Sequence, residues 1–212
     1  MRVLPIFMNL ERLASAPSDE KLDCALKQGE KYILFVGRVV PNKCFEDILD
    51  LFECYYRFHN SATKLILVGN DACDQDYARE IKEKLDQLSC KQQVIFTGKV
   101  SDSQLYTYYR NATAFVCMSE HEGFCIPLLE AMYFHIPVIG YDSCAVPDTM
   151  GKSGVLVYKK DPAKIASLLN EICTDENLRS CIIAAQNKNV EYYLHDSMKE
   201  QLKQLLSEGE NW

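Results

Sequence analysis

The chain has 212 residues, of which 48% are hydrophobic, and its formal net charge at pH 7 is −7. This length fits one large domain or two small ones, and such a chain can bury a substantial hydrophobic core. The acidic charge argues against nucleic acid as the main partner, because phosphate backbones select basic surfaces. The sequence also lacks the stretch of about 20 apolar residues that a membrane span needs.

Residues 1–30 differ from the rest of the chain and are predicted to be an entry segment rather than a domain. Residues 4–7 are apolar enough to pair as an edge strand. Ser18 and Asp19 are typical residues before a helix, and Gly29 is a typical residue after one, so a short helix is expected between them.

From residue 32 onward, short apolar runs alternate with longer helical patterns. Each run is almost continuously apolar, which is typical of parallel strands covered on both faces. The six runs are 32–37, 64–69, 93–98, 113–118, 137–141 and 154–158.

The helical patterns lie between and after these runs. They cover 42–59, 76–88, a segment that starts at Ser101 and Asp102, 126–134, 161–173, 175–189 and one long amphipathic stretch at 190–206. The alternation predicts an α/β, Rossmann-like, doubly wound domain of about six parallel strands over residues 31–190. Residues 191–212 are predicted to form a C-terminal amphipathic helix and tail.

The loop after the first predicted strand reads GRVVPNK over residues 37–43. Gly37 permits close approach of the backbone, and Arg38 and Lys43 stand beside the start of a helix, which suits a diphosphate. The alternative is an arginine and a lysine that are merely solvated. The chain has no Walker ending and no G-x-G-x-x-G, which argues against a dinucleotide redox enzyme.

The loop after the fourth predicted strand reads SEHEGFCIPLLE over residues 119–130. Gly123 lets the backbone approach a ligand, and Pro127 fits the first turn of a helix. The N–H groups of Phe124, Cys125 and Ile126 are then expected to meet an anion or a hydroxyl group.

Glu122 and Glu130 flank this helix start. Glu130 is about one turn inside the helix, roughly 6 Å further along at 1.5 Å per residue. We interpret the two as acceptors for hydroxyl groups at separate places on one polyhydroxylated ligand, and not as an acid–base pair. The alternative is a Glu122 that serves the helix dipole and a Glu130 on the surface.

Four segments, FVGR…K, VIFTGKV, SEHEGFCIPLLEAM and PVIGYDSCAVPDTMGKSGVLV, follow one another along the chain. In order and spacing they resemble the C-terminal half of retaining glycosyltransferases of the GT-B fold, the glycosyl transferases group 1, also called family 4. The resemblance covers roughly residues 30–190. It implies a hexosyltransferase-type enzyme whose Rossmann-like C-terminal domain binds a UDP- or GDP-sugar.

The resemblance also implies roles for individual residues. Arg38 and Lys43 hold the diphosphate, Glu122 meets the donor sugar, and Glu130 meets the ribose. Arg38, Lys43 and Glu122 are the expected catalytic residues. The remaining expected donor contacts are Gly37, the turn from Gly98 to Val100, and the backbone of Gly123, Phe124, Cys125 and Ile126.

The sequence departs from the family pattern at a few positions. Cys44, Cys125 and His135 stand where the family often has glycine, and Asp148 replaces a usual glutamate. The four side chains with implied roles are all present. His121 and His135 are interpreted as packing or surface residues.

An enzyme of the GT-B fold has two Rossmann-like domains with the active site between them, and this chain has room for one. The resemblance therefore implies an incomplete half that lacks the N-terminal acceptor domain, which another domain or a partner subunit would supply. We favour a fragment over a truncated gene product or a subunit of a split enzyme. Any peripheral membrane association would come through that missing half.

Two other readings stay open: a nucleotide-sugar-binding module without catalysis, and another GT-B activity such as nucleotide-sugar epimerisation.

The ten cysteines show no CxxC pairing and no metal-ligand spacing with the four histidines. We interpret them as reduced thiols of a cytoplasmic protein. Because no Asp-x-Asp motif stands at a strand end and two cations can neutralise a diphosphate, no metal or other cofactor is expected.

Overall fold

The computed structural model describes residues 10, 13, 15–29 and 31–209, with side chains described up to residue 207. Its centre is a six-stranded sheet in which every neighbouring pair is parallel, in the order β3-β2-β1-β4-β5-β6. The strands are β1 Tyr32–Val36, β2 Lys64–Val68, β3 Val94–Gly98, β4 Ala114–Cys117, β5 Val138–Tyr141 and β6 Val155–Val157. Each lies within a predicted run, so the predicted fold class is confirmed.

Helices connect and cover these strands. They are α2 Glu20–Lys27, α3 Phe45–Phe58, α4 Gln75–Asp86, α5 Asp102–Asn111, α6 Ile126–Tyr133, α7 Val146–Met150, α8 Pro162–Thr174, α9 Glu176–Glu191 and α10 His195–Gly209, with short 3₁₀ turns η1 Pro41–Lys43 and η2 Lys91–Gln93. Helix α3 packs on α4 and α8, and α6 packs on α9. Because parallel crossovers are right-handed, the helices after β1 and β2 cover one face and those after β4 and β5 cover the other.

The predicted helix starts are confirmed where a polar side chain caps the first turn. The Asp19 carboxylate accepts a hydrogen bond from the Leu22 amide before α2. Ser101 and Gln104 form a reciprocal capping box at the start of α5. The central strands β1 and β4 carry the core between the helical layers, and Leu34 and Phe115, which pair across them, are fully buried.

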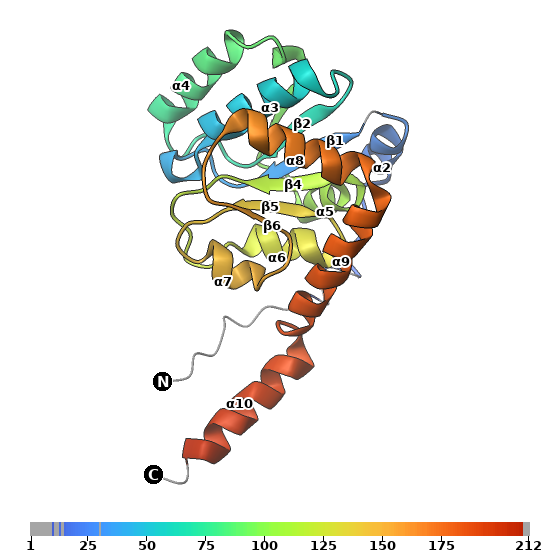
Figure 1. Ribbon diagram of the computed structural model, residues 1–212, viewed down its shortest axis with the longest axis vertical. Helices are drawn as coiled ribbons and strands as arrows, with labels where there is room; N and C mark the ends of the chain where they lie inside the picture. The colour runs from blue at the N-terminus through green and yellow to red at the C-terminus, as the bar shows by residue number, and fades with distance from the viewer. Residues whose placement is uncertain (1–9, 11–12, 14, 30, 210–212) are drawn as a thin grey trace.

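The end of the chain differs from the prediction of one long helix over 190–206. Helix α9 ends at Glu191, and α10 begins at His195 and projects away from the body (Figure 1). The break lets the Tyr193 ring pack edge-on against Phe124 with the ring centroids 5.7 Å apart, and Tyr193 is 5% exposed. The apolar spacing of residues 190–206 runs across this corner, and no glycine or proline marks it.

Two smaller differences concern α3 and α7. The first crossover helix starts at Phe45 rather than Asn42, because residues 41–43 form η1 and Cys44 has a left-handed backbone. The short helix α7 was not predicted. The expected edge strand at residues 4–7 lies outside the described residues. Within the described part of the chain, no helix has the length and apolar character needed to cross a bilayer.

Candidate functional site

The middle of the sheet is its topological switch point. The chain leaves β1 toward β2 on one side and leaves β4 toward β5 on the other. In open parallel sheets such a divergence creates a ligand crevice beyond the carboxyl ends of the strands. The two segments that meet there are residues 37–44, called the β1 loop, and residues 118–125, called the β4 loop.

Two hydrogen bonds to backbone carbonyl oxygens hold the two loops together. The Asn42 side-chain amide donates to the His121 carbonyl oxygen at 2.9 Å, and the Glu120 amide donates to the Asn42 carbonyl oxygen at 3.0 Å. Residues that are far apart in the sequence therefore share one site because β1 and β4 pair side by side.

Lys43 and Glu122 form an ion pair across the two loops, with Lys43 Nζ 2.5 Å from Glu122 Oε1. The two side chains are only 17% and 9% exposed. Lys43 is expected at the diphosphate and Glu122 at the donor sugar, and the two side chains are in direct contact in the structure. A partly buried pair of this kind strengthens in the lower dielectric, and each charge compensates the other.

Lys160 makes a second link, between the β4 loop and the helix that follows the β1 loop, which was not predicted from the sequence. Its Nζ lies 2.6 Å from Asp47 in the first turn of α3 and 2.9 Å from Glu120 in the β4 loop. Burial by itself would lower the pKa of Lys160, but the hydrogen bonds to these carboxylates outweigh it and raise that pKa. Lys160 follows β6 in a loop without a recognisable motif, so no local signal pointed to it.

Each loop ends in a cysteine with a left-handed backbone. Cys44 has φ 49° before α3, and Cys125 has φ 61° before α6. This region is unfavourable for residues that carry a Cβ. His135, with φ 57°, follows α6 in the same conformation. The three positions where the sequence departs from a family glycine therefore coincide with left-handed residues.

The two helix starts differ in what meets their N-termini. At α3, the Phe45 amide donates to the Tyr77 hydroxyl at 2.9 Å, and that hydroxyl donates to Glu46. Glu46 and Asp47 also place carboxylates in the first turn. The first amide of α3 is therefore occupied by a side chain of α4, and the carboxylates of Glu46 and Asp47 make this helix start unfavourable for an anion beside Arg38 and Lys43.

The N-terminus of α6 is open by comparison. Its first turn contains no acidic residue, and Pro127 occupies one of the first two positions. Within the described structure, the amides of Phe124, Cys125 and Ile126 donate no hydrogen bond. Arg38 is exposed and has no ion-pair partner among the described residues. These groups form the part of the site that can meet an anion.

Glu130 lies in α6 and contacts a side chain of α5. Its Oε2 accepts a hydrogen bond from the Tyr109 hydroxyl at 2.9 Å. Tyr109 is fully buried on α5, and burial together with the Glu130 charge raises its pKa well above the ordinary value. Glu130 is half-buried, so the surface alternative for this residue does not describe it.

The carboxyl ends of β1, β2 and β3 approach one another closely. The Gly37 amide donates to the Val68 carbonyl at 2.9 Å, and the Gly69 amide donates to the Gly98 carbonyl at 3.2 Å. A Cβ on Gly69 would lie 1.8 Å from the Gly37 carbonyl oxygen, so only glycine fits there. The turn that follows leads to Val100, which packs against the core.

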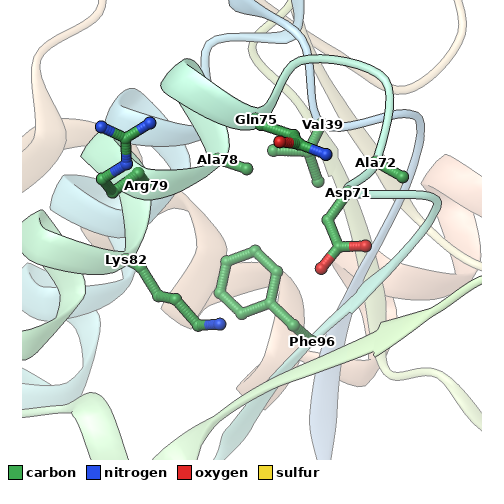
Figure 2. A pocket seen from close by; sticks show the side chains of 8 residues that line it. All are labelled: Val39, Asp71, Ala72, Gln75, Ala78, Arg79, Lys82 and Phe96. Atoms are coloured by element: carbon green, nitrogen blue, oxygen red, sulfur yellow. The ribbon is translucent and has the colours of Figure 1, made fainter.

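A cavity of about 570 Å³ lies beside this edge, between β3 and α4 (Figure 2). Figure 2 shows the Phe96 ring in the wall, with the Lys82 ammonium and the Asp71 carboxylate near it. None of the predicted site residues lines this cavity. Its lining residues are Val39, Asp71, Ala72, Gln75, Ala78, Arg79, Lys82 and Phe96.

The arrangement of loops at the switch point can be compared with known proteins. The family profile described as "Glycosyl transferases group 1" matches residues 19–189. The chain belongs to this family.

Curated members of the glycosyl transferases group 1 family are about twice as long as this chain. An uncharacterized glycosyltransferase of Methanocaldococcus jannaschii is 30% identical over 176 residues, which are 82% of this chain and 44% of that protein. The O-antigen chain mannosyltransferase RfbU of Salmonella typhimurium is 30% identical over 183 residues, 86% of this chain and 49% of that protein. The chain thus spans about half the length of these relatives.

Solved structures confirm the fold at lower identity. The Anabaena protein HepE, in complex with UDP and glucose, matches with a TM-score of 0.78 and 19% identity, over 98% of this chain and 57% of HepE. The C-terminal domain of the group 1 protein LpcC from Francisella tularensis matches with a TM-score of 0.72 and 23% identity, over 89% of this chain and 99% of that domain. This glycosyl transferases group 1 chain therefore has the Rossmann-like architecture found in GT-B enzymes.

Proposed function

We propose that this chain is the donor-binding half of a retaining glycosyltransferase that takes sugar from a nucleotide diphosphate for polysaccharide or glycoconjugate synthesis. The observation that carries the proposal is the start of α6, whose first amides donate no hydrogen bond to a described residue. It directly follows the loop that contains Glu122 and lies next to the β1 loop with Arg38 and Lys43. The complex of HepE with UDP and glucose supports the ligand class. The mannosyltransferase among the relatives supports hexosyl transfer.

In the proposed mechanism, the protein acts mainly by electrostatic stabilisation. When the glycosidic bond breaks, negative charge grows on the leaving nucleotide diphosphate. Arg38, Lys43 and the amides of Phe124, Cys125 and Ile126 would neutralise that charge where it develops. We propose that transfer needs no metal ion, because these groups already provide the positive field.

We propose that the donor binds by replacing the ion pair between Lys43 and Glu122. As sugar hydroxyls reach Glu122, the carboxylate can exchange its ammonium partner for them, and Lys43 becomes available to a phosphate oxygen. Glu130, which Tyr109 orients through a hydrogen bond, would meet the ribose. The turn at residues 98–100 would meet the base.

The acceptor side is proposed to come from elsewhere. Because the chain spans about half of its relatives, a second domain or a partner subunit would close over the donor and complete the active site. The domain limits of 31–190 and 191–212 and a cytoplasmic location remain predictions.

Isothermal titration of the folded chain with UDP, GDP, UMP, GMP, UDP-glucose and inorganic diphosphate tests the proposal. We expect a nucleoside diphosphate to bind at one site and more tightly than the matching nucleoside monophosphate, because the second phosphate meets the open amides and Arg38. A folded chain that binds none of these nucleotides would contradict it. The epimerase alternative is separated by adding donor without acceptor to the complete two-domain protein and looking for the epimeric sugar.

A further inference from the structure

Three side chains around the β4 loop bring metal-binding atoms together. Cys117 ends β4, Cys125 ends the loop, and Glu122 lies between them in sequence. The sulfur atoms of Cys117 and Cys125 are 3.8 Å apart. One ligand atom from each of the three residues lies within 4.8 Å of the others. Cys117 and Cys125 are 1% and 5% exposed, so the cluster is shielded from solvent.

The spacing of the two sulfur atoms fits a shared tetrahedral ion. Two thiolates bound to Zn²⁺ at about 2.3 Å in tetrahedral geometry lie roughly 3.8 Å apart. A disulfide requires sulfur atoms at about 2.05 Å, so it would need the loop to move inward. The Glu122 carboxylate completes three ligands and leaves one position open.

The charges around the cluster also suit a divalent cation. Two thiolates and the Glu122 carboxylate together carry three negative charges. A divalent cation and the Lys43 ammonium, 2.5 Å from Glu122 Oε1, balance them. Binding would release the two thiol protons, which couples the affinity to pH.

We propose that Cys117, Cys125 and Glu122 form a binding site for a soft divalent cation of the Zn²⁺ type. The cation is not a cofactor of transfer: it holds the carboxylate that the donor sugar needs, so its occupancy inhibits donor binding. This inhibition rests on the proposed function, whereas the site itself does not.

A second cluster in the same region provides a control. Cys44, Asp47 and Glu120 also bring ligand atoms within 4.8 Å of one another. There the Lys160 ammonium already contacts both carboxylates and supplies the cation. Cys44 has the same left-handed backbone and the same place before a helix as Cys125, so Cys44→Gly matches Cys125→Gly in everything but the proposed ligand.

Titration with Co²⁺, a coloured substitute for Zn²⁺, tests the site in the full chain without nucleotide. The exposed cysteines, Cys24, Cys73, Cys144 and Cys181, are first replaced by serine to remove accidental ligands. We expect one equivalent of Co²⁺ to produce a thiolate-to-metal charge-transfer band, which Zn²⁺ then abolishes.

The variants decide which residues bind the metal. Cys117→Ser and Cys125→Gly should each lose the band and weaken binding by more than the roughly 10–100-fold that loss of an outer-shell partner costs. Cys44→Gly should keep the band. The site is overturned if the parent gives no band, if both ligand variants retain it, or if Cys44→Gly loses it; circular dichroism confirms that each variant is folded. A UDP titration of the metal-free chain then reports on the proposed function separately.

Discussion

The β1 loop and the β4 loop have the same backbone design and opposite electrostatics. Both follow a central strand, and both end in a left-handed cysteine directly before a helix. At α3 the helix start is closed by the Tyr77 hydroxyl and two carboxylates. At α6 the first turn has no acidic residue, and its first amides donate no hydrogen bond to any described residue. The backbone geometry thus brings both helix starts to the switch point, and the side chains decide which one can bind an anion.

The difference also gives each loop a separate role. The β1 loop supplies cations from its side chains, Arg38 and Lys43, and the β4 loop supplies backbone amides together with Glu122. Lys43 and Lys160 tie the two loops to each other through carboxylates. The experiments below break one connection or one loop feature at a time.

The largest effect is expected from removing one partner of the link between the loops. Lys43→Met should lower the free energy of unfolding by about 3 kcal/mol, because it leaves the Glu122 carboxylate nearly buried without its partner. Lys43→Met combined with Glu122→Gln should recover most of that loss in a double-mutant cycle measured by urea unfolding.

Lys84→Met is the matched control for this cycle. The pair of Lys84 with Asp50 has side chains that are 33% and 40% exposed, so the loss should be at most about 1 kcal/mol. If Lys43→Met and Lys84→Met lowered the free energy of unfolding equally, the ion pair between Lys43 and Glu122 would contribute no more to stability than an exposed pair.

The next effect concerns Arg38, the exposed arginine of the β1 loop. Arg38→Ala should weaken UDP binding by about 1.5–3 kcal/mol, the range for a charged hydrogen bond, and leave the free energy of unfolding nearly unchanged. Arg79→Ala, in the wall of the cavity of Figure 2, removes the same charge elsewhere and should leave UDP affinity unchanged. Isothermal titration of both variants decides, and a normal affinity in Arg38→Ala would remove that residue from the site.

The second link between the loops should show itself in alkaline solution. Lys160→Met should cost about 1–2 kcal/mol at neutral pH, since it removes a partly buried ion pair with Asp47 and a more exposed one with Glu120. The pKa of Lys160 is raised from its ordinary 10.5, so the folded state retains the proton longer than the unfolded state. The parent's advantage over Lys160→Met is therefore constant from neutral pH to about pH 10 and is lost as pH rises through the raised pKa. Urea unfolding measured from neutral to alkaline pH would contradict this if the difference did not fall at the alkaline end.

The smallest effect compares the two left-handed cysteines directly. Cys44→Gly should be more stable than Cys44→Ala by about 1 kcal/mol, because both remove the thiol and only glycine relieves the left-handed backbone. The same difference is expected between Cys125→Gly and Cys125→Ala. Thermal unfolding of the four variants measures it, and a difference at only one position would show that the loops are not equivalent in backbone strain.

The sequence was sufficient for the sheet but not for the contacts at its edge. Continuously apolar runs identified the six strands of the sheet, and in the central strands β1, β2 and β4 these runs reflect burial on both faces. Ser101 and Asp19 located helix starts through their capping chemistry. Lys43 and Glu122 were each singled out, but their ion pair depends on the pairing of β1 with β4, which local patterns do not encode.

Other features of the site had even weaker signals in the sequence. Cysteine is not a typical left-handed residue, so Cys44 and Cys125 were noticeable only where the family has glycine. Helix propensity predicted α3 from Asn42, and the left-handed Cys44 shortened it. The contact of Glu130 with Tyr109 joins two helices whose relative position follows from the fold.

The corner between α9 and α10 gives the site a mechanical connection to the end of the chain. Tyr193 sits at this corner, and its ring rests against Phe124, the residue that carries one of the open amides at α6. Helix α10 extends from this corner away from the body of the molecule (Figure 1). Because the Tyr193 ring joins this corner to Phe124, a displacement of α10 would be transmitted through that ring to the backbone at the start of α6.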